Sequence, residues 1–360
     1  MPHTFQLVQH FIDRLIDQSR TPAAGIAIAV DGEPVYSHIA GDSRPGVPAT
    51  DDTLWPVASL SKIYTASAIM SLIEEGRLAL WTKASAILPE LNGDGREEIT
   101  LRQLLTHTSG LPSEPANMLE LLQRGATWDQ FDSRAFSDPL LFPPGTGQCY
   151  SSIGYGIAGR MAAAVAEVSF AELLRVRVFD RAGLTETELV LSEVWYQRAA
   201  HVVGTEGEGT EWALNGSLSG ARIGHPAHGV FATLADLLRF LLLFDPSSPE
   251  KFHSTAGLRV MTTDQTNVFR SAAPVLSAEY PVSKWGAGFM IQGENGEVGL
   301  ASPESYGHLG GTGCVGWIDP VHRVTVAFVS NSDVWHGFDE WRDRLEEAVN
   351  VAIAGATARG

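Results

Sequence analysis

The sequence has little cysteine, little lysine and no long apolar run, and each scarcity argues against a class of protein. Its 360 residues contain two cysteines, Cys149 and Cys314. Two cysteines are too few for a disulfide framework, and their spacing does not fit a paired-cysteine zinc site. A His-Glu-x-x-His motif is missing as well. We therefore expect neither a metal nor a cofactor.

The chain is also poor in positive charge. Asp and Glu outnumber Lys and Arg by 42 to 25, which gives a formal net charge of −17. Nucleic acids and anionic membranes select for basic surfaces. No stretch approaches the roughly 18 apolar residues of a membrane span. We expect neither nucleic acid nor membrane as a partner.

Residues 1–20 lack the features of a secretory signal. Their apolar residues are interrupted by His3, His10, Asp13 and Asp17. A signal peptide needs a positively charged start and a continuous apolar core. We therefore expect a cytoplasmic protein.

Apolar spacing predicts a helix and then a hairpin at the start of the chain. Over residues 5–18 the apolar side chains recur three and four apart, as in an amphipathic helix. The runs GIAIAV (25–30) and VYSHIAG (35–41) flank Asp31-Gly32, a dipeptide typical of hairpin turns. The same patterns predict further helices at residues 59–75, 99–108, 155–168, 232–244 and 337–354, with strand-like runs between 285 and 330.

This order of elements predicts an α+β fold. The terminal portions would share one antiparallel sheet, flanked by the N- and C-terminal helices, and the middle would form a mostly helical lobe. We expect residues 1–360 to form a single unit with two sub-lobes, 1–55 with 280–360 and 56–279. A cleft between such lobes is a common place for a ligand.

Within the helix predicted at 59–75, Ser59 is followed three residues later by Lys62. Residues three apart lie on one helix face, so the Lys62 amine can approach the Ser59 hydroxyl and act as its proton partner. Ser59 would also lie in the first turn, where free N–H groups favour a developing oxyanion. A serine N-cap followed by a solvated lysine is the simpler interpretation. The flanking residues are too apolar for a surface helix, however, and a buried lysine needs a partner or a role.

Two further motifs follow in the chain: CYSSIGYGIAG (149–159) and YGHLGGTGCVGW (306–317). With Ser59-x-x-Lys62, THTSGLP (106–112) and HPAHGVFATLADLLRF (225–240), they resemble the serine β-lactamase and penicillin-binding-protein superfamily. The similarity extends from about residue 5 to 350 and is strongest to class C β-lactamases, family VIII carboxylesterases and D-amino-acid peptidases. It implies a β-lactamase/transpeptidase-like fold.

The resemblance also implies residue roles. Ser59 would be the acylated nucleophile, Lys62 its proton partner and Tyr150 a second proton-transfer group, whose phenolate a nearby ammonium would favour. The backbone N–H groups of Ser59 and Gly311 would form the oxyanion hole. Ser152, His308 and Gly310 would contact the substrate.

Three positions depart from the family pattern. Ser152 replaces the asparagine of Tyr-x-Asn, and His308 replaces the lysine of Lys-Thr-Gly, so a fixed positive charge is lost. Both changes favour neutral acyl donors such as esters over β-lactams. His228 stands where many relatives have glycine, and the sequence assigns it no role.

Other signals carry less weight. Gly-x-Ser-x-Gly is missing, which argues against an α/β-hydrolase. Cys149 and Cys314 are interpreted as small buried residues, and His107 as a packing or capping residue. The acidic segment 204–211 is interpreted as a solvated loop.

We therefore predict a serine hydrolase that acts through an acyl-enzyme on a small-molecule ester or amide, with a carboxylesterase as the first hypothesis. A β-lactamase or D-amino-acid amidase or peptidase is the second. An acyltransferase, or a binding protein without turnover, is the third, although an inert binder would not need Ser59, Lys62 and Tyr150 together. The sequence leaves the oligomeric state open.

Overall fold

The structure, a computed structural model, describes residues 5–115, 117–203, 218–266, 284–294, 296, 298–333 and 338–358. The acidic segment predicted as a loop at 204–211 lies outside these residues.

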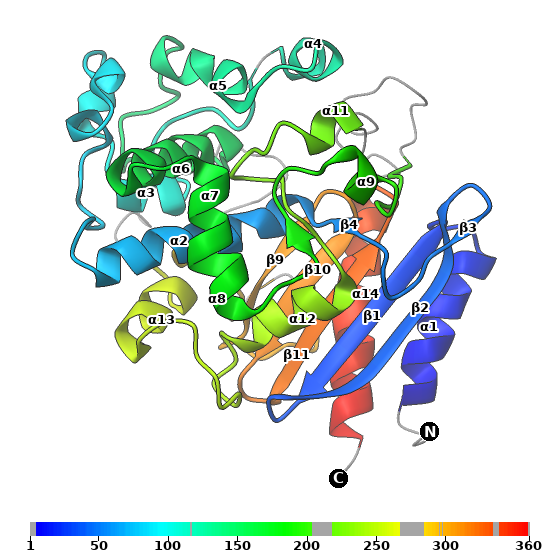
Figure 1. Ribbon diagram of the computed structural model, residues 1–360. Coiled ribbons are helices and arrows are strands. Elements are labelled where there is room, and N and C mark those ends of the chain that lie inside the picture. The colour runs from blue at the N-terminus through cyan, green and yellow to red at the C-terminus, as the bar shows by residue number, and fades with distance from the viewer. Residues whose placement is uncertain are drawn as a thin grey trace.

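An eight-stranded sheet forms the centre of the fold (Figure 1). Its spatial order is β3-β2-β1-β11-β10-β9-β8-β7, and every neighbouring pair is antiparallel. The strands are β1 (Ala23–Val30), β2 (Glu33–Arg44), β3 (Val47–Pro48), β7 (Lys284–Trp285), β8 (Met290–Ile291), β9 (Tyr306–Gly310), β10 (Cys314–Asp319) and β11 (Val324–Ser330). Pairing of β1 with β11 joins the two ends of the chain in one sheet, as predicted.

The hairpin turn between β1 and β2 has the predicted chemistry. Asp31 and Gly32 both adopt positive φ, 56° and 80°. Such a turn matches the right-handed twist of the strands on either side, and Asp-Gly is one of the dipeptides that tolerate it. This local signal places the turn of the first hairpin, and the register of its two strands shifts further along, between Ile28 and Ala29.

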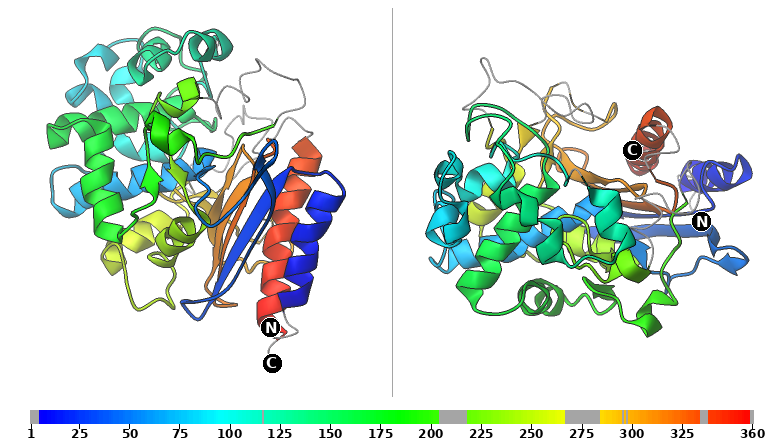
Figure 2. Two further views of the ribbon diagram at one scale, coloured as in Figure 1. Left: turned by 45° about the vertical axis from the view of Figure 1, so that its right-hand side comes forward. Right: turned by 90° about the horizontal axis from the view of Figure 1, so that it is seen from above.

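Helices α1 (Gln6–Asp17) and α14 (Phe338–Thr357) cover one face of the sheet and lie side by side (Figure 2). The apolar stripe predicted for α1 is buried, at Val8, Phe11, Ile12 and Leu15. These side chains pack with β1, β11 and α14 in one core cluster. The predicted α+β arrangement, with terminal helices flanking an antiparallel sheet, is therefore confirmed.

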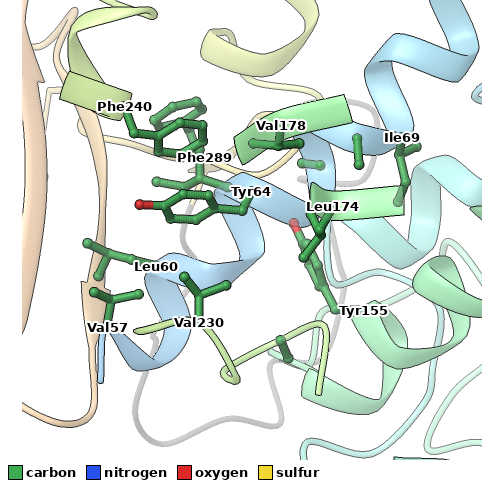
Figure 3. Close-up of a cluster of buried hydrophobic side chains, with 14 of the residues drawn as sticks. Val57, Leu60, Tyr64, Ile69, Tyr155, Leu174, Val178, Val230, Phe240 and Phe289 are labelled. Carbon is green, nitrogen blue, oxygen red and sulfur yellow. The ribbon is translucent and has the colours of Figure 1, made fainter. Parts of the chain in front are cut away.

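The opposite face carries α12 (Leu234–Leu242), which contacts β1, β10 and β11 and begins directly after its N-cap, Thr233. Beyond it lie α2 (Ser61–Glu74) and α6 (Ser152–Ala166), which contact each other. Figure 3 shows the apolar cluster around α2, in which the Tyr64 ring stacks on Phe240 with 3.8 Å between ring centroids. The residues Ser61–Leu72 are buried, which confirms that this helix is internal.

The middle of the chain contains a small sheet that the sequence did not predict. Its strands are β4 (Trp55–Pro56), β6 (Phe231–Ala232) and β5 (Thr187–Glu188), in that order. Further helices are α3 (Leu101–Leu105), α4 (Met118–Gln123), α5 (Trp128–Phe131), α7 (Phe170–Leu174), α8 (Asp180–Ala182), α9 (Glu193–Tyr196), α11 (Leu218–Ala221) and α13 (Thr255–Thr262). The division into two sub-lobes stays a prediction. Among the described residues, no helix has both the length and the apolarity to cross a membrane.

Candidate active site

Ser59 lies in a 3₁₀ turn, Ala58–Leu60, that runs directly into α2. The residue before it, Ala58, has φ 45°, a left-handed conformation that an alanine adopts only under constraint. Two contacts hold the chain just before this turn. β4 pairs with β6, and the Thr312 hydroxyl donates to the Pro56 carbonyl at 2.5 Å. The candidate nucleophile is therefore placed by the small sheet and by the turn after β9.

Lys62 projects from the first turn of α2 and is fully buried. Its Nζ lies 3.2 Å from Ser59 Oγ and 3.4 Å from Ser152 Oγ. It also donates to the Ala227 carbonyl at 3.2 Å. An ammonium group has three donors, and these three oxygens suit them. The structure thus brings together three of the residues predicted for the site.

Tyr150 precedes α6, whose N-cap Ser151 accepts a hydrogen bond from the Gly154 N–H at 2.9 Å. The Lys62 Nζ lies 4.7 Å from the centroid of the Tyr150 ring and 5.7 Å from that of Tyr155. Both distances are within the range of a cation–π contact, which stabilises a buried cation. Lys62 and Tyr150 are therefore close neighbours, as the resemblance implied.

Two histidines flank Tyr150. The His107 ring centroid is 4.4 Å from that of Tyr150, and the His308 centroid is 6.2 Å away. Burial and the nearby Lys62 ammonium hold the pKa of His107 well below its usual range. The same two causes lower the pKa of His308 to about 3. Both imidazoles are therefore neutral near pH 7. The positive charge next to Tyr150 comes from Lys62 and not from these two histidines.

The tautomers of these histidines follow from their hydrogen bonds. The Ser151 N–H donates to Nδ1 of His107 at 3.0 Å, so the proton of this neutral ring is on Nε2. Nδ1 of His308 lies 2.6 Å from the Leu309 carbonyl and must be the donor, because a carbonyl only accepts. The prediction that His107 packs or caps is consistent with its position between Tyr150, Tyr155 and Trp285.

A narrow cavity of about 30 Å³ opens at Ser59. Its lining combines two predicted residues, Ser59 and Ser152, with residues that sequence reasoning did not assign: Pro56, Ala58, Glu114, Met118, His228 and Thr312. The sequence marked His228 only as a departure from the family pattern. Glu114 lies in a loop that matches no motif, so no signal pointed to it.

The glycine-rich motif at residues 306–317 lies close to the nucleophile turn through its backbone. Gly310 ends β9, and an added Cβ there would lie 2.7 Å from the Val57 carbonyl oxygen, two residues before Ser59. Gly311 follows directly and precedes Thr312, which lines the cavity. His308 is fully buried beside Tyr150 and Trp285 and is not among the residues that line the cavity. The substrate-binding and oxyanion-hole roles stay predictions.

Across the part of the chain that the structure describes, no cluster of three or more His, Cys, Asp or Glu residues is arranged to hold a metal ion. The thiols of Cys149 and Cys314 are buried, and burial raises the pKa of Cys314 to about 11. Such a thiol is protonated and inert at neutral pH.

Comparison with known proteins identifies the family. The profile described as Beta-lactamase matches residues 8–350. The chain belongs to the β-lactamase family. Penicillin-binding protein 4 of Amycolatopsis lactamdurans is 27% identical over 372 residues, which cover 98% of this chain and 92% of that protein. The resemblance found in the sequence is confirmed.

Solved structures of β-lactamase-family proteins share the fold. A penicillin-binding-protein homologue from Caulobacter crescentus superposes with a TM-score of 0.78 at 25% identity and covers 98% of both chains. A family VIII carboxylesterase superposes with a TM-score of 0.76 at 20% identity, covering 97% of this chain and 98% of that one. The chain is a serine hydrolase of the β-lactamase and penicillin-binding-protein fold. Small esters and amides are the substrates typical of this family.

Proposed function

We propose that this chain is a carboxylesterase that acts on neutral, small acyl esters through an acyl-enzyme on Ser59. The observation that carries the proposal is the buried Lys62 ammonium within 3.2 Å of Ser59 Oγ. A buried charge is costly unless it is paired or used. A lysine beside a serine that opens on a cavity gives that serine a partner for proton transfer.

The reaction would proceed in two stages. Ser59 Oγ attacks the ester carbonyl and gives its proton to the coupled pair Lys62 and Tyr150. Collapse of the tetrahedral intermediate breaks the bond to the alcohol, which leaves with that proton. Water then attacks the acyl-Ser59 ester, and the acid product leaves. Donors in an oxyanion hole are worth roughly 3–4 kcal/mol each in such reactions.

The charges of the side chains at the site favour esters over β-lactams as substrates. A penicillin or cephalosporin carries a carboxylate, and the resemblance implies that β-lactamases have a lysine where this chain has His308. Here that position is a buried imidazole whose pKa is lowered to about 3 by burial and by Lys62, so it offers no positive charge near pH 7. Glu114 also lines the cavity, and an ionised Glu114 would repel a second carboxylate.

A matched pair of substrates tests this directly. We expect p-nitrophenyl butyrate, which is neutral, to be hydrolysed with a kcat/KM at least about tenfold above that of p-nitrophenyl hemisuccinate, which has a similar length and a terminal carboxylate. Glu114→Gln should narrow the gap, because it removes the repelling charge and keeps the shape. Ser59→Ala should be inactive on both.

A β-lactamase or D-peptidase remains the second hypothesis, favoured by the 27% identity to Penicillin-binding protein 4 along nearly the whole chain. It predicts rapid turnover of a chromogenic cephalosporin or release of D-alanine from a D-alanyl-D-alanine peptide. A kcat/KM for either substrate above that for the neutral ester would overturn the esterase proposal.

A further inference from the structure

His228 belongs to a tightly held segment that runs along α2. Three hydrogen bonds tie this segment to the helix: Thr65 Oγ1 to the Pro226 carbonyl at 2.7 Å, Lys62 Nζ to the Ala227 carbonyl at 3.2 Å, and the Val230 N–H to Ser61 Oγ at 3.0 Å. The N–H groups of His228 and Gly229 both donate to the His225 carbonyl and close a turn. The backbone of His228 is therefore fixed relative to the nucleophile turn.

The imidazole ring of His228 is fixed as well. It stacks on the ring of His225, with 4.4 Å between centroids and 2° between planes. The Ala227 N–H donates to Nδ1 of His225 at 3.0 Å, so the proton of that ring is on Nε2 and is donated to Asp132 at 3.1 Å. Asp132 is fully buried and also accepts from the Trp128 indole at 2.6 Å. This chain of contacts orients the His228 ring at the cavity.

The cavity that His228 lines has the size and polarity of a water site. Its volume of about 30 Å³ exceeds the roughly 10–15 Å³ that a single buried water requires. A buried water needs two to four polar partners. The polar lining residues are Ser59, Glu114, Ser152, His228 and Thr312. Of these, His228 and Glu114 have titratable side chains that can take a proton from water.

We propose that this cavity holds the water that hydrolyses the acyl-enzyme, and that His228 is the general base that activates it. The inference rests on the proposed acylation of Ser59. A free imidazole nitrogen of His228 takes one proton from the water as its oxygen bonds to the acyl carbon. When the tetrahedral intermediate collapses, the bond from carbon to Ser59 Oγ breaks. The proton held by His228 passes to Oγ, which restores both residues and releases the acid.

The charge state of His228 suits this role. Burial, then His225 and Lys62, hold the pKa of His228 well below its usual range. The ring is therefore neutral near pH 7 and has a nitrogen lone pair for water. Lys62 and Tyr150 remain the proton partners of Ser59 in acylation, so the two half-reactions would depend on different bases.

The test separates acylation from deacylation with p-nitrophenyl acetate. Wild type, His228→Gln and His228→Phe are compared for the p-nitrophenol burst, the steady-state rate and the mass of the intact protein. Phe keeps the stacked ring without a nitrogen, and Gln keeps a hydrogen-bonding group without a useful base. The exposed His10, changed to Gln, serves as the control.

We expect both His228 variants to give a burst of about one equivalent, to accumulate acetyl-Ser59 and to deacylate about 100-fold more slowly than wild type. His228→Gly should lose the same step and regain part of it with added imidazole. Deacylation at the wild-type rate in His228→Phe would overturn the inference and leave only a packing role. A wild type that never acetylates Ser59 would instead refute the proposed function.

Discussion

Replacement of Gly310 by alanine tests whether the close approach of β9 positions the nucleophile turn. The new Cβ would lie 2.7 Å from the Val57 carbonyl oxygen and 3.2 Å from a methyl of Leu60. A backbone oxygen has no rotamer to change, so the turn itself must move. Reaching an ordinary contact requires a shift of at least about half an ångström.

That shift has two measurable consequences. Overpacking of this kind costs about 1–3 kcal/mol of folding stability. A misplacement of about 1 Å in an active site can cost about 100-fold in rate, so half that distance should cost about tenfold in kcat/KM. We expect Gly310→Ala to lose both, with activity measured on p-nitrophenyl butyrate and stability by urea unfolding.

Gly316→Ala is the matched control. Gly316 lies on the neighbouring strand β10, and its added Cβ would meet the side-chain methyls of Leu241 at 2.9 Å and of Leu60 at 3.2 Å. Those side chains can rotate, so this variant should lose stability while its kcat/KM stays within about twofold of wild type. Equal turnover in the two variants would refute the claim that the strand positions the nucleophile turn.

Three further outcomes follow from the geometry around Lys62. Lys62→Met should lower kcat by at least about 100-fold, because it removes the proton partner of Ser59. It should not destabilise the fold, since an apolar side chain of similar size replaces a buried charge. A kcat near wild type would contradict the role of Lys62 in proton transfer. Tyr150→Phe keeps the ring 4.7 Å from Nζ and deletes only the hydroxyl, so an acylation rate unchanged in single-turnover experiments would remove Tyr150 from proton transfer. Burial and Lys62 lower the pKa of the buried His308 to about 3. His308 therefore contributes folding stability that is present above its ordinary pKa of about 6.5 and is lost as the pH falls toward 3. Between pH 6.5 and 5 this amounts to about 2 kcal/mol, so urea unfolding of His308→Gln should show a smaller loss over that interval than wild type.

Local patterns in the sequence predicted the outer architecture well. The spacing of Val8, Phe11, Ile12 and Leu15 placed α1 on the sheet, because an amphipathic stripe has to be buried somewhere. Asp31-Gly32 set the first hairpin through its tolerance of positive φ. In both cases neighbouring residues alone carry the signal.

The small sheet had no such signal. Each of its strands contains two residues, too few for alternation to be seen, and Trp55 pairs with Ala232 from far along the chain. That pairing depends on the surrounding tertiary structure. The sequence therefore predicted a mostly helical middle and missed the element that holds the segment before Ser59.

The candidate site likewise contains residues that local sequence patterns predicted and residues that they did not. Lys62 follows Ser59 by three residues at the start of α2, so their spacing, together with the apolar residues on either side, predicted their contact. Glu114 and His228 reach the same cavity from segments far apart in the chain. Only the packing of the helical region brings them to Ser59, and no local pattern records that packing.

The central claim, that Ser59 carries the acyl group, is tested most directly by mass spectrometry of the protein quenched during turnover of p-nitrophenyl acetate. We predict one acetyl group per chain, located on the peptide that contains Ser59, and a p-nitrophenol burst of matching size. Ser59→Ala should show neither the added mass nor the burst while it unfolds in urea like wild type. Acetyl on another residue, or undiminished release of p-nitrophenol by Ser59→Ala, would contradict the account.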